Sequence, residues 1–376
     1  MTHWVGTWSQ GLSDHSFLQL GAEGRTLRTV VRASLGGSRM RVRFSNRFGR
    51  QPLRIDAASV ALAGEGMVIR AHTLRELTFA GQPGIRLPEG KDIFSDPVDL
   101  PVPSLAGVAV SMYFERAVLY DTANIGQGRM YGSTPGNHVM EEASFLPFSS
   151  IEEEYPLPFI AGIDVFSPDH ARAVVAFGDS ITAMGWPAML AERLDALGMA
   201  HIGVLNQGLG GNRVLHTNTD PILSAYGLSG LTRFHKDVLE QAGVRHVLVL
   251  HGINDIGHPG FVAPIEEAVT PQGIHTGLEQ YAVWAHSAGI RIYAGTLLPF
   301  GGFRDWSPDL EEERQGVNTF IRNGKAFDDV WDLDTAMRDP SAPLRLLPAY
   351  DSGDHLHPSP RGLCAIAEAV DVEWFK

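Results

Sequence analysis

The features of this sequence that could do chemistry are four short polar segments. Segment 178–182 reads Gly-Asp-Ser-Ile-Thr, and segment 354–358 reads Asp-His-Leu-His-Pro. Between them lie segment 206–212 (Asn-Gln-Gly-Leu-Gly-Gly-Asn) and segment 252–255 (Gly-Ile-Asn-Asp). Serine, histidine and carboxylate are the groups of nucleophilic catalysis, and amides can stabilise an anion that forms during a reaction. Together the segments suggest serine-dependent chemistry.

Ser180 follows a short apolar run, 173–177, and leads towards a helical stretch. At such a strand-to-helix turn a hydroxyl can project into a cleft, and backbone N–H groups can face a developing anion. Taken alone, Gly-Asp-Ser is better explained as a plain turn with a helix N-cap. The serine becomes a candidate nucleophile only beside the other three segments.

Asp354 and His357 are three residues apart, so they can meet on one turn, where the carboxylate fixes the tautomer of the imidazole. His355 is a rival base. The two histidines with Asp351 and Asp354 also supply metal-ligand types, but no other cluster in the sequence has metal spacing. We therefore expect no metal and no organic cofactor.

The two middle segments supply glycines and amides. The glycines of 206–212 let the backbone approach a ligand closely, or serve a loop that needs positive φ. A dinucleotide loop is disfavoured because the segment lacks Gly-x-Gly-x-x-Gly and does not follow the first strand. Asn254 can donate a hydrogen bond into a cleft, and the alternative is a plain Asn-Asp turn.

The elements that must position these segments alternate between strand and helix after residue 170. The pattern predicts strands at 173–177, 201–206, 244–250, 290–297 and 330–333, and helices at 187–197, 278–288, 310–323 and 361–370. This rhythm predicts a parallel sheet covered on both faces, with ligands beyond the carboxyl ends of its strands. The first three segments follow strands directly, and the fourth precedes the last helix.

The first half of the chain has a different character. Short runs that alternate polar and apolar residues, broken by Gly, Pro, Asn and Asp, predict strands at 27–35, 39–44, 53–62 and 108–114. No long helix is expected here, and the pattern favours an antiparallel β-sandwich of jelly-roll type. We predict two domains, 1–168 and 169–376, joined by a linker at 163–170.

Composition limits the partners. The chain has 376 residues, a formal net charge of −13 and no Lys/Arg cluster, which disfavours nucleic acid and anionic membrane surfaces. No apolar run is long enough to span a membrane, and no signal peptide is visible. We expect a cytoplasmic protein as the chain stands, or a secreted one if a signal has been removed. The single cysteine, Cys364, lies in an apolar stretch and is predicted to be a buried structural thiol.

In their order along the chain, the four segments resemble the blocks of the SGNH/GDSL hydrolase superfamily. Segments 26–28, 34–37, 42–46 and 48–49, and also 252–257 and 349–358, resemble a subgroup of bacterial and fungal acylhydrolases and arylesterases with an extra N-terminal domain. Some members of that subgroup are associated with plant polysaccharide breakdown. The resemblance covers nearly the whole chain and implies a flavodoxin-like three-layer α/β/α catalytic domain.

Carried over by position, the resemblance implies that Ser180 is the nucleophile, His357 the general base and then acid, and Asp354 its orienting partner. It implies an oxyanion hole made of the backbone N–H groups of Ser180 and Gly211 and the side chain of Asn254. Many relatives carry an Asp-Gly and a longer polar insertion after the nucleophile, whereas 181–186 runs almost straight into the helix here. Two side chains of this stretch either wall the substrate pocket or pack into the core; they are Met184 and Trp186.

The resemblance implies a carboxylic ester hydrolase that acts through an acyl-serine on a small-molecule or carbohydrate ester. We rank an acetylated sugar first, a short aryl ester second and a lysophospholipid third, because an acidic chain without an amphipathic membrane segment disfavours lipid surfaces. A carbohydrate-binding module fused to a degenerate hydrolase and a metal-dependent hydrolase are the alternatives from other classes. The sequence leaves the oligomeric state open.

Overall fold

The computed structural model describes residues 1–142, 148–151 and 155–376. The chain divides into two compact units, Met1–Arg172 and Ala173–Lys376. All four polar segments lie in the second unit. In the part of the chain that the structure describes, no helix combines the length and the apolar character needed to cross a membrane.

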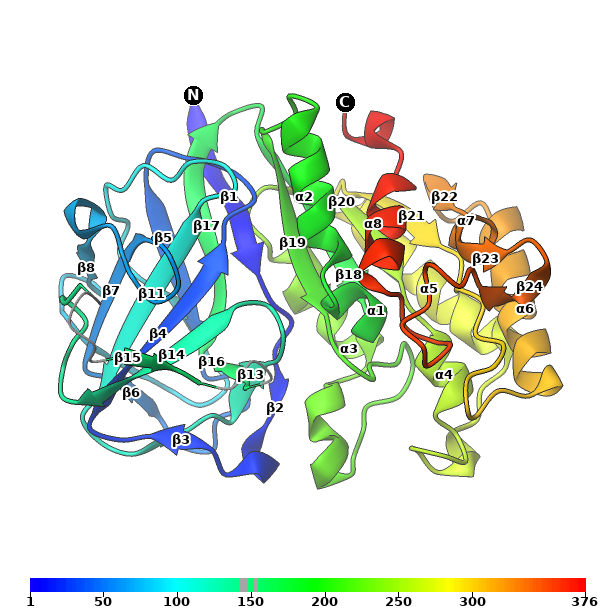
Figure 1. Cartoon of the computed structure of the whole chain (residues 1–376), viewed down its shortest axis with the longest axis horizontal. Coiled ribbons are helices and arrows are strands. Elements are labelled where there is room, and N and C mark those ends of the chain that lie inside the picture. Colours follow the sequence, from blue (N-terminus) through cyan, green and yellow to red (C-terminus); the bar gives the residue numbers. More distant parts are fainter. Residues whose placement is uncertain (143–147, 152–154) are drawn as a thin grey trace. The chain divides into compact units, whose positions relative to one another are not determined.

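The first unit is a β-sandwich of two antiparallel sheets, in agreement with the prediction (Figure 1). The four-stranded sheet has the order β1 (Thr2–Ser9), β17 (Ile160–Pro168), β5 (Met40–Ser45) and β10 (Asp92–Phe94). The six-stranded sheet has the order β15 (Phe148–Ser150), β14 (Arg129–Pro135), β4 (Arg25–Arg32), β11 (Gly107–Phe114), β7 (Ala57–Leu62) and β8 (Arg75–Leu77). Apolar side chains of both sheets, such as Phe44 and Val110, are fully buried and form the core. The jelly-roll connectivity stays a prediction.

Smaller pairings complete the chain. In the first unit β2 (Ser13–Asp14) and β16 (Leu157–Pro158) flank β13 (Thr122–Asn124), β3 (Gly21–Ala22) pairs with β12 (Val118–Leu119), and β6 (Leu53–Ile55) pairs with β9 (Ile85–Leu87). In the second unit β23 (Arg338–Asp339) pairs with β24 (Ala342–Leu346).

The predicted linker at 163–170 is wrong. Most of it belongs to β17, which pairs antiparallel with both β1 and β5. Ile163 and Val165 are buried in the sandwich core, so this stretch is held on both edges and on its apolar side. Pro168 suggested a break, but it stands at the last position of the strand, beyond the residues that pair with β5.

The second unit contains a five-stranded sheet in the order β19 (Ile202–Gly208), β18 (Arg172–Gly178), β20 (Val244–Leu250), β21 (Arg291–Gly295) and β22 (Asp329–Trp331). The pairs β18–β20, β20–β21 and β21–β22 are parallel. The second strand of the unit thus lies outside the first, which is the flavodoxin-like order. The structure confirms the predicted flavodoxin-like fold.

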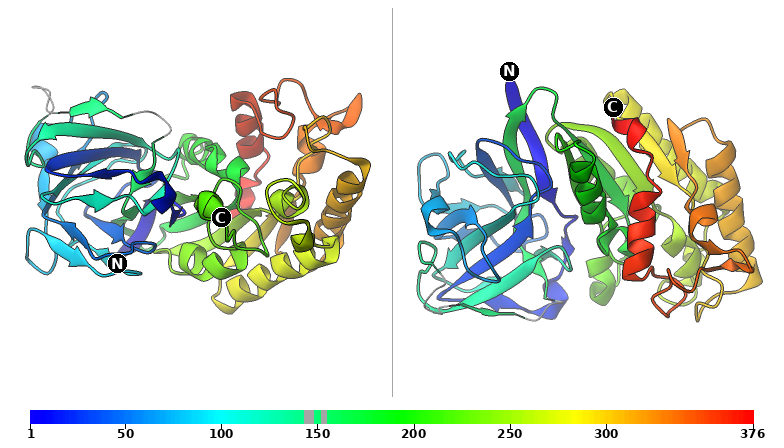
Figure 2. Two further views of the ribbon diagram at one scale, coloured as in Figure 1. Left: turned by 90° about the horizontal axis from the view of Figure 1, so that it is seen from below. Right: turned by 45° about the horizontal axis from the view of Figure 1, so that its top comes forward.

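Helices flank this sheet on both faces (Figures 1 and 2). Helix α2 (Trp186–Ala196) packs against α8 (Pro360–Glu368), and α5 (Pro271–Ser287) packs against α6 (Pro308–Asn323). Three of them begin alike, with a Ser or Thr side chain that accepts a hydrogen bond from the first turn and a proline directly after it; these N-caps are Thr270, Ser307 and Ser359. The short helices are α1 (Ser180–Ala183), α3 (Gly230–Phe234), α4 (Ile253–Gly257) and α7 (Leu333–Met337).

The prediction that Cys364 is a buried thiol is also wrong, because the structure exposes this residue. Helix α8 buries Leu363, Ile366 and Ala367, which recur at the three- and four-residue spacing of one helix face. Cys364 falls outside that face, and its sulfur lies 3.5 Å from the sulfur of Met189. An apolar stretch on a helix is thus buried on one face only.

Candidate active site

Ser180 stands at the turn between β18 and α1. The carboxylate of Asp179 accepts a hydrogen bond from the backbone N–H of Ile181 at 3.0 Å, so Asp179, not the serine, caps the helix. A Cβ on Gly178 would lie 2.2 Å from the carbonyl oxygen of Leu250, so only glycine fits this close approach of β18 to β20. The turn is therefore locked, and it presents the serine at the carboxyl end of a central strand.

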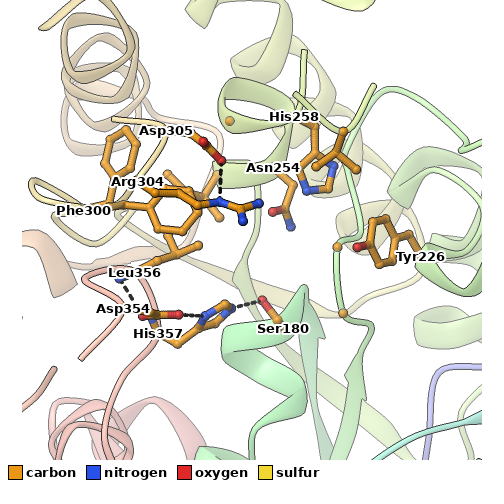
Figure 3. Close-up of a pocket in the computed structure, with 16 residues that line it drawn as sticks. Ser180, Tyr226, Asn254, His258, Phe300, Arg304, Asp305, Asp354, Leu356 and His357 are labelled. Atoms are coloured by element: carbon orange, nitrogen blue, oxygen red, sulfur yellow. Dashed lines mark hydrogen bonds and ion pairs between the residues drawn. The ribbon is translucent and has the colours of Figure 1, made fainter. Parts of the chain in front are cut away.

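Ser180, His357 and Asp354 form a continuous line of hydrogen bonds (Figure 3). The Oγ of Ser180 lies 2.9 Å from Nε2 of His357, and Nδ1 of His357 lies 2.6 Å from Oδ2 of Asp354. Partial burial raises the pKa of Asp354, but hydrogen bonds from the ring and backbone N–H of His357 and from the backbone N–H of Leu356 outweigh it and bring the pKa to about 2. An ionised Asp354 accepts from Nδ1–H, which leaves Nε2 as the acceptor of the serine proton.

His355, the rival base, points into a pair of its own. Its Nδ1 lies 2.5 Å from Oδ2 of Asp351, and its backbone N–H donates to Oδ1 of the same carboxylate at 3.0 Å. The φ of His355 is +67°, and its ring lies against Gly302, where an added Cβ would come within 3.2 Å of it. His355 is absent from the residues that line the cavity beside Ser180.

The four side chains of the metal alternative do not converge. Asp351 with His355 and Asp354 with His357 form two separate pairs. Among the residues that the structure describes, no group of three or more His, Cys, Asp or Glu side chains is placed to hold a metal ion.

The glycine loop and Asn254 meet beside Ser180. Gly211 has a φ of +68°, and a Cβ there would overlap the ring of Tyr226 at 2.4 Å, so the loop does need a glycine with positive φ. The Nδ2 of Asn254 donates to the backbone oxygen of Asn212 at 3.0 Å. Since an amide nitrogen carries two hydrogens, one remains for a ligand. Asp255 accepts hydrogen bonds from the backbone just after the loop, so it steadies that stretch.

These groups open into one cavity of about 510 Å³. It brings together Ser180, Gly211, Asn254, Asp354 and His357, five of the seven residues predicted for the site. Its walls are largely apolar and aromatic; they include Tyr226, Ile253, Val262, Phe300, Phe303 and Leu356. Polar groups at the same cavity are His258, Arg304 and Asp305, and Nε of Arg304 donates to Asp305 at 3.1 Å (Figure 3).

The two predicted pocket residues of the short 181–186 segment lie elsewhere. Trp186 is 0% exposed and packs edge-to-face on Trp331 with 5.0 Å between ring centroids. Met184 is 43% exposed. Neither lines the cavity. Helix α1 is a single turn, and α2 begins at Trp186. The tryptophan therefore belongs to the buried face of α2 and packs in the core.

Sequence reasoning missed the cavity walls, which come from loops after β20 and β21 and from a short 3-10 turn at Pro221–Tyr226. No sequence motif includes Phe300, Phe303 or Tyr226, and an aromatic residue in a loop is compatible with many roles. Only knowledge of which loops share the sheet edge of Ser180 could have selected them.

Residues 176–363 match the model of the GDSL-like Lipase/Acylhydrolase family. No curated protein matches the chain. Similar solved structures include a GDSL-like lipase from Bacteroides thetaiotaomicron, with 19% identity, a TM-score of 0.39, and coverage of 53% of this chain and 85% of that chain.

The lipase/acylhydrolase from Enterococcus faecalis is 22% identical, with a TM-score of 0.40, and the match covers 53% of this chain and 92% of that chain. A catalytic mutant of an acetylxylan esterase from Geobacillus stearothermophilus is 21% identical, with a TM-score of 0.39 and coverage of 53% and 91%. Since the family match spans half of the residues and includes the serine turn, the glycine loop and the Asp–His segment, this protein belongs to the GDSL-like lipase/acylhydrolase family.

Proposed function

We propose that this protein hydrolyses carboxylic esters through a covalent acyl-serine on Ser180. The observation that carries the proposal is the hydrogen-bonded line from Ser180 through His357 to Asp354, which ends in the cavity that Asn254 and Gly211 also line. A nucleophile, a base, an orienting carboxylate and amide donors at one cavity are the parts that acyl transfer requires.

In the first half of the reaction, Oγ of Ser180 attacks the ester carbonyl while Nε2 of His357 takes the serine proton. The tetrahedral intermediate then breaks its bond to the alcohol, which leaves with the proton from His357. In the second half, water attacks the acyl-serine and gives its proton to His357, which returns it to Ser180 as the acid leaves. Asp354 stays ionised throughout and stabilises the imidazolium.

The oxyanion is held by the backbone N–H groups of Ser180 and Gly211 and by the free amide hydrogen of Asn254. These donors are fixed before substrate arrives, because the glycine loop and α4 are hydrogen-bonded to each other. Fixed donors need no reorganisation when charge develops, and each contributes about 2.7–4 kcal/mol to transition-state stabilisation.

The cavity favours a small ester. Its volume of about 510 Å³ lies in the range of small-molecule sites, and its aromatic walls suit an acetyl or aryl group. Arg304 and Asp305 supply a donor and an acceptor for the polar part of a small-molecule or carbohydrate ester.

The test is hydrolysis of p-nitrophenyl esters from acetate to palmitate by the wild type and Ser180→Ala, with Ser287→Ala on the exposed side of α5 as the matched control. We expect activity on acetate that falls with chain length, is lost in Ser180→Ala and is kept in Ser287→Ala. Equal activity in the wild type and Ser180→Ala would refute the mechanism. Activity that rises towards palmitate would keep the mechanism and reassign the substrate to lipid esters.

A further inference from the structure

A buried arginine outside the four polar segments donates hydrogen bonds to two of them. Arg233 belongs to α3, and its side chain is only 2% exposed. Its guanidinium stacks on the ring of Phe177 at 4.0 Å and pairs with Asp237 at 3.1 Å, one turn further along. Because a buried cation is costly unless its donors are satisfied, the groups it binds indicate what it does.

Three of these groups come from segments that meet at Ser180. Nη2 of Arg233 donates to the carbonyl oxygen of Gly178 at 2.6 Å, at the end of β18 and two residues before the serine. Nη1 donates to the carbonyl oxygen of Gln207 at 2.8 Å, near the end of β19. Nε donates to Oδ1 of Asn212 at 2.8 Å, in the glycine loop. One planar group therefore fixes the distance between the serine turn and the loop that holds Gly211.

Asn212 also connects Arg233 to Asn254. Asn212 accepts from Arg233 on its side chain and from Asn254 on its backbone oxygen, and its Nδ2 donates to the carbonyl oxygens of Tyr226 and Leu228. A continuous set of hydrogen bonds thus runs from Arg233 to both the loop and the amide of the oxyanion hole. Tyr226, at the end of the same set, is a wall of the cavity.

We infer that Arg233 is a positioning residue of the proposed ester hydrolysis, which holds the nucleophile turn, the glycine loop and Asn254 at the spacing that the tetrahedral intermediate requires. It acts through those segments and touches no reacting atom. The inference rests on the proposed function. It goes beyond that function because it assigns the relative positions of the oxyanion-hole donors to a side chain that belongs to none of the four polar segments.

The chain offers a matched control. Arg314 of α6 is 0% exposed and also makes four hydrogen bonds, to Glu311, Asp334 and the carbonyl oxygen of Leu297. It belongs to the same unit and is as buried as Arg233, but none of its acceptors lies in the four polar segments. By contrast, Arg233 binds Gly178 in the serine segment and Gln207 and Asn212 in the glycine segment. If kcat falls only because a buried cation has lost hydrogen bonds, it should fall in variants of both arginines. If kcat falls because the site is no longer positioned, it should fall only in the variant of Arg233.

The experiment compares Arg233→Lys with Arg314→Lys. Lysine keeps the positive charge but lacks the rigid fork of donors, so it cannot hold three separated acceptors at once. Measured quantities are the thermal midpoint, kcat and KM on p-nitrophenyl acetate, and the inhibition constant of phenylboronic acid, which forms a tetrahedral adduct on a catalytic serine. A displacement of about 1 Å in a catalytic group costs about 10²-fold in rate.

We expect Arg233→Lys to lose kcat by about that factor, with KM within about threefold and with boronate affinity reduced in parallel. Arg314→Lys should lower the thermal midpoint and keep kcat. Should Arg233→Lys not fold, Asn212→Ser leaves Arg233 and Asp237 in place and removes the acceptor in the loop, and it is expected to weaken kcat and boronate affinity together.

The outcomes separate the inference from the proposed function. Wild-type kcat in Arg233→Lys or Asn212→Ser, with Ser180→Ala inactive, overturns the role of Arg233 and leaves the ester hydrolase intact. The same kcat loss in Arg314→Lys also overturns it, since the effect is then general loosening of the unit. An active Ser180→Ala overturns both.

Discussion

Two Asp–His pairs of the same chemistry lie within seven residues of each other. In both, a carboxylate accepts from Nδ1 of a histidine and from backbone N–H groups of its own turn: Asp354 with His357, and Asp351 with His355. Of the two histidines, only His357 brings its other ring nitrogen to a hydroxyl group, with Nε2 lying 2.9 Å from Oγ of Ser180. The ring of His355 lies instead against Gly302.

The comparison teaches that an Asp–His pair has no catalytic meaning until its surroundings are known. Hydrogen bonds bring the pKa of both carboxylates below its ordinary value against the opposing effect of partial burial, so ionisation does not distinguish the pairs. What distinguishes them is position. The pair of Asp351 and His355 lies at the start of the turn that carries His357, and a β-bridge between Asp351 and Pro358 closes that turn.

The largest expected effect separates the two histidines. His357→Ala should lose roughly 10⁴- to 10⁶-fold in kcat on p-nitrophenyl acetate, because the serine then has no base. His355→Ala should keep kcat within about tenfold, since His355 only steadies the turn. A fully active His357→Ala enzyme with an inactive His355→Ala enzyme would transfer the base to His355 and invert the assignment.

The carboxylates should differ nearly as much. Asp354→Asn changes the tautomer of His357 and is expected to lower kcat by about 10⁴-fold. Asp351→Asn keeps an acceptor for the backbone of the turn and should lower kcat by less than about tenfold. Steady-state kinetics at pH 7 on both variants tests this, and equal losses would mean that the two pairs act as one unit.

A smaller loss of kcat is expected when Asn254, which belongs to neither Asp–His pair, is replaced. Asn254→Ala removes one oxyanion donor and should cost about 10²- to 10³-fold in kcat with KM little changed. The double variant Asn254→Ala with His355→Ala should show additive losses. An unchanged kcat in Asn254→Ala would place the oxyanion hole elsewhere.

The smallest effect concerns stability in acid. The folded pKa of Asp354 is about 2, below the ordinary value of 3.8, and that of Asp351 is also lowered. Each pair therefore stabilises the fold above pH 4, and this contribution is lost as pH falls from about 4 towards 2. Chemical denaturation at pH 4 and pH 3 should show a smaller loss for Asp351→Asn than for the wild type. An identical loss would mean that the pair does not contribute.

The sequence predicted the parts whose signal is local. Strand β20 was predicted with its observed bounds, because seven mostly apolar residues between polar segments leave little freedom. The order of the four segments, through its resemblance to the SGNH/GDSL blocks, predicted Ser180, Asp354 and His357 as one site. That the ends of parallel strands share an edge of the sheet explains why the first three segments meet, but not the fourth, which precedes α8.

What the sequence could not predict depends on contacts between distant segments. Pro168 is a local signal for a break, so the sequence suggested a linker at 163–170. The antiparallel pairing with β1, which makes most of this stretch a strand, cannot be read from the local sequence. Arg233 belongs to none of the four polar segments, and only the folded chain shows Gly178, Gln207 and Asn212 around it. Trp186 could be assigned to the core only once Trp331 was seen beside it.

The position of β17 also has a consequence for how the chain is made. Its residues pair with β1 from Thr2 opposite Pro168 onwards, so the four-stranded sheet joins the first strand of the chain to the last strand of its unit. On a ribosome that adds about 5–20 residues per second, β1 waits roughly 10 to 30 seconds for its partner. During that time its free edge is open to wrong pairing, and a chaperone that shields nascent β1 should raise the yield of native protein.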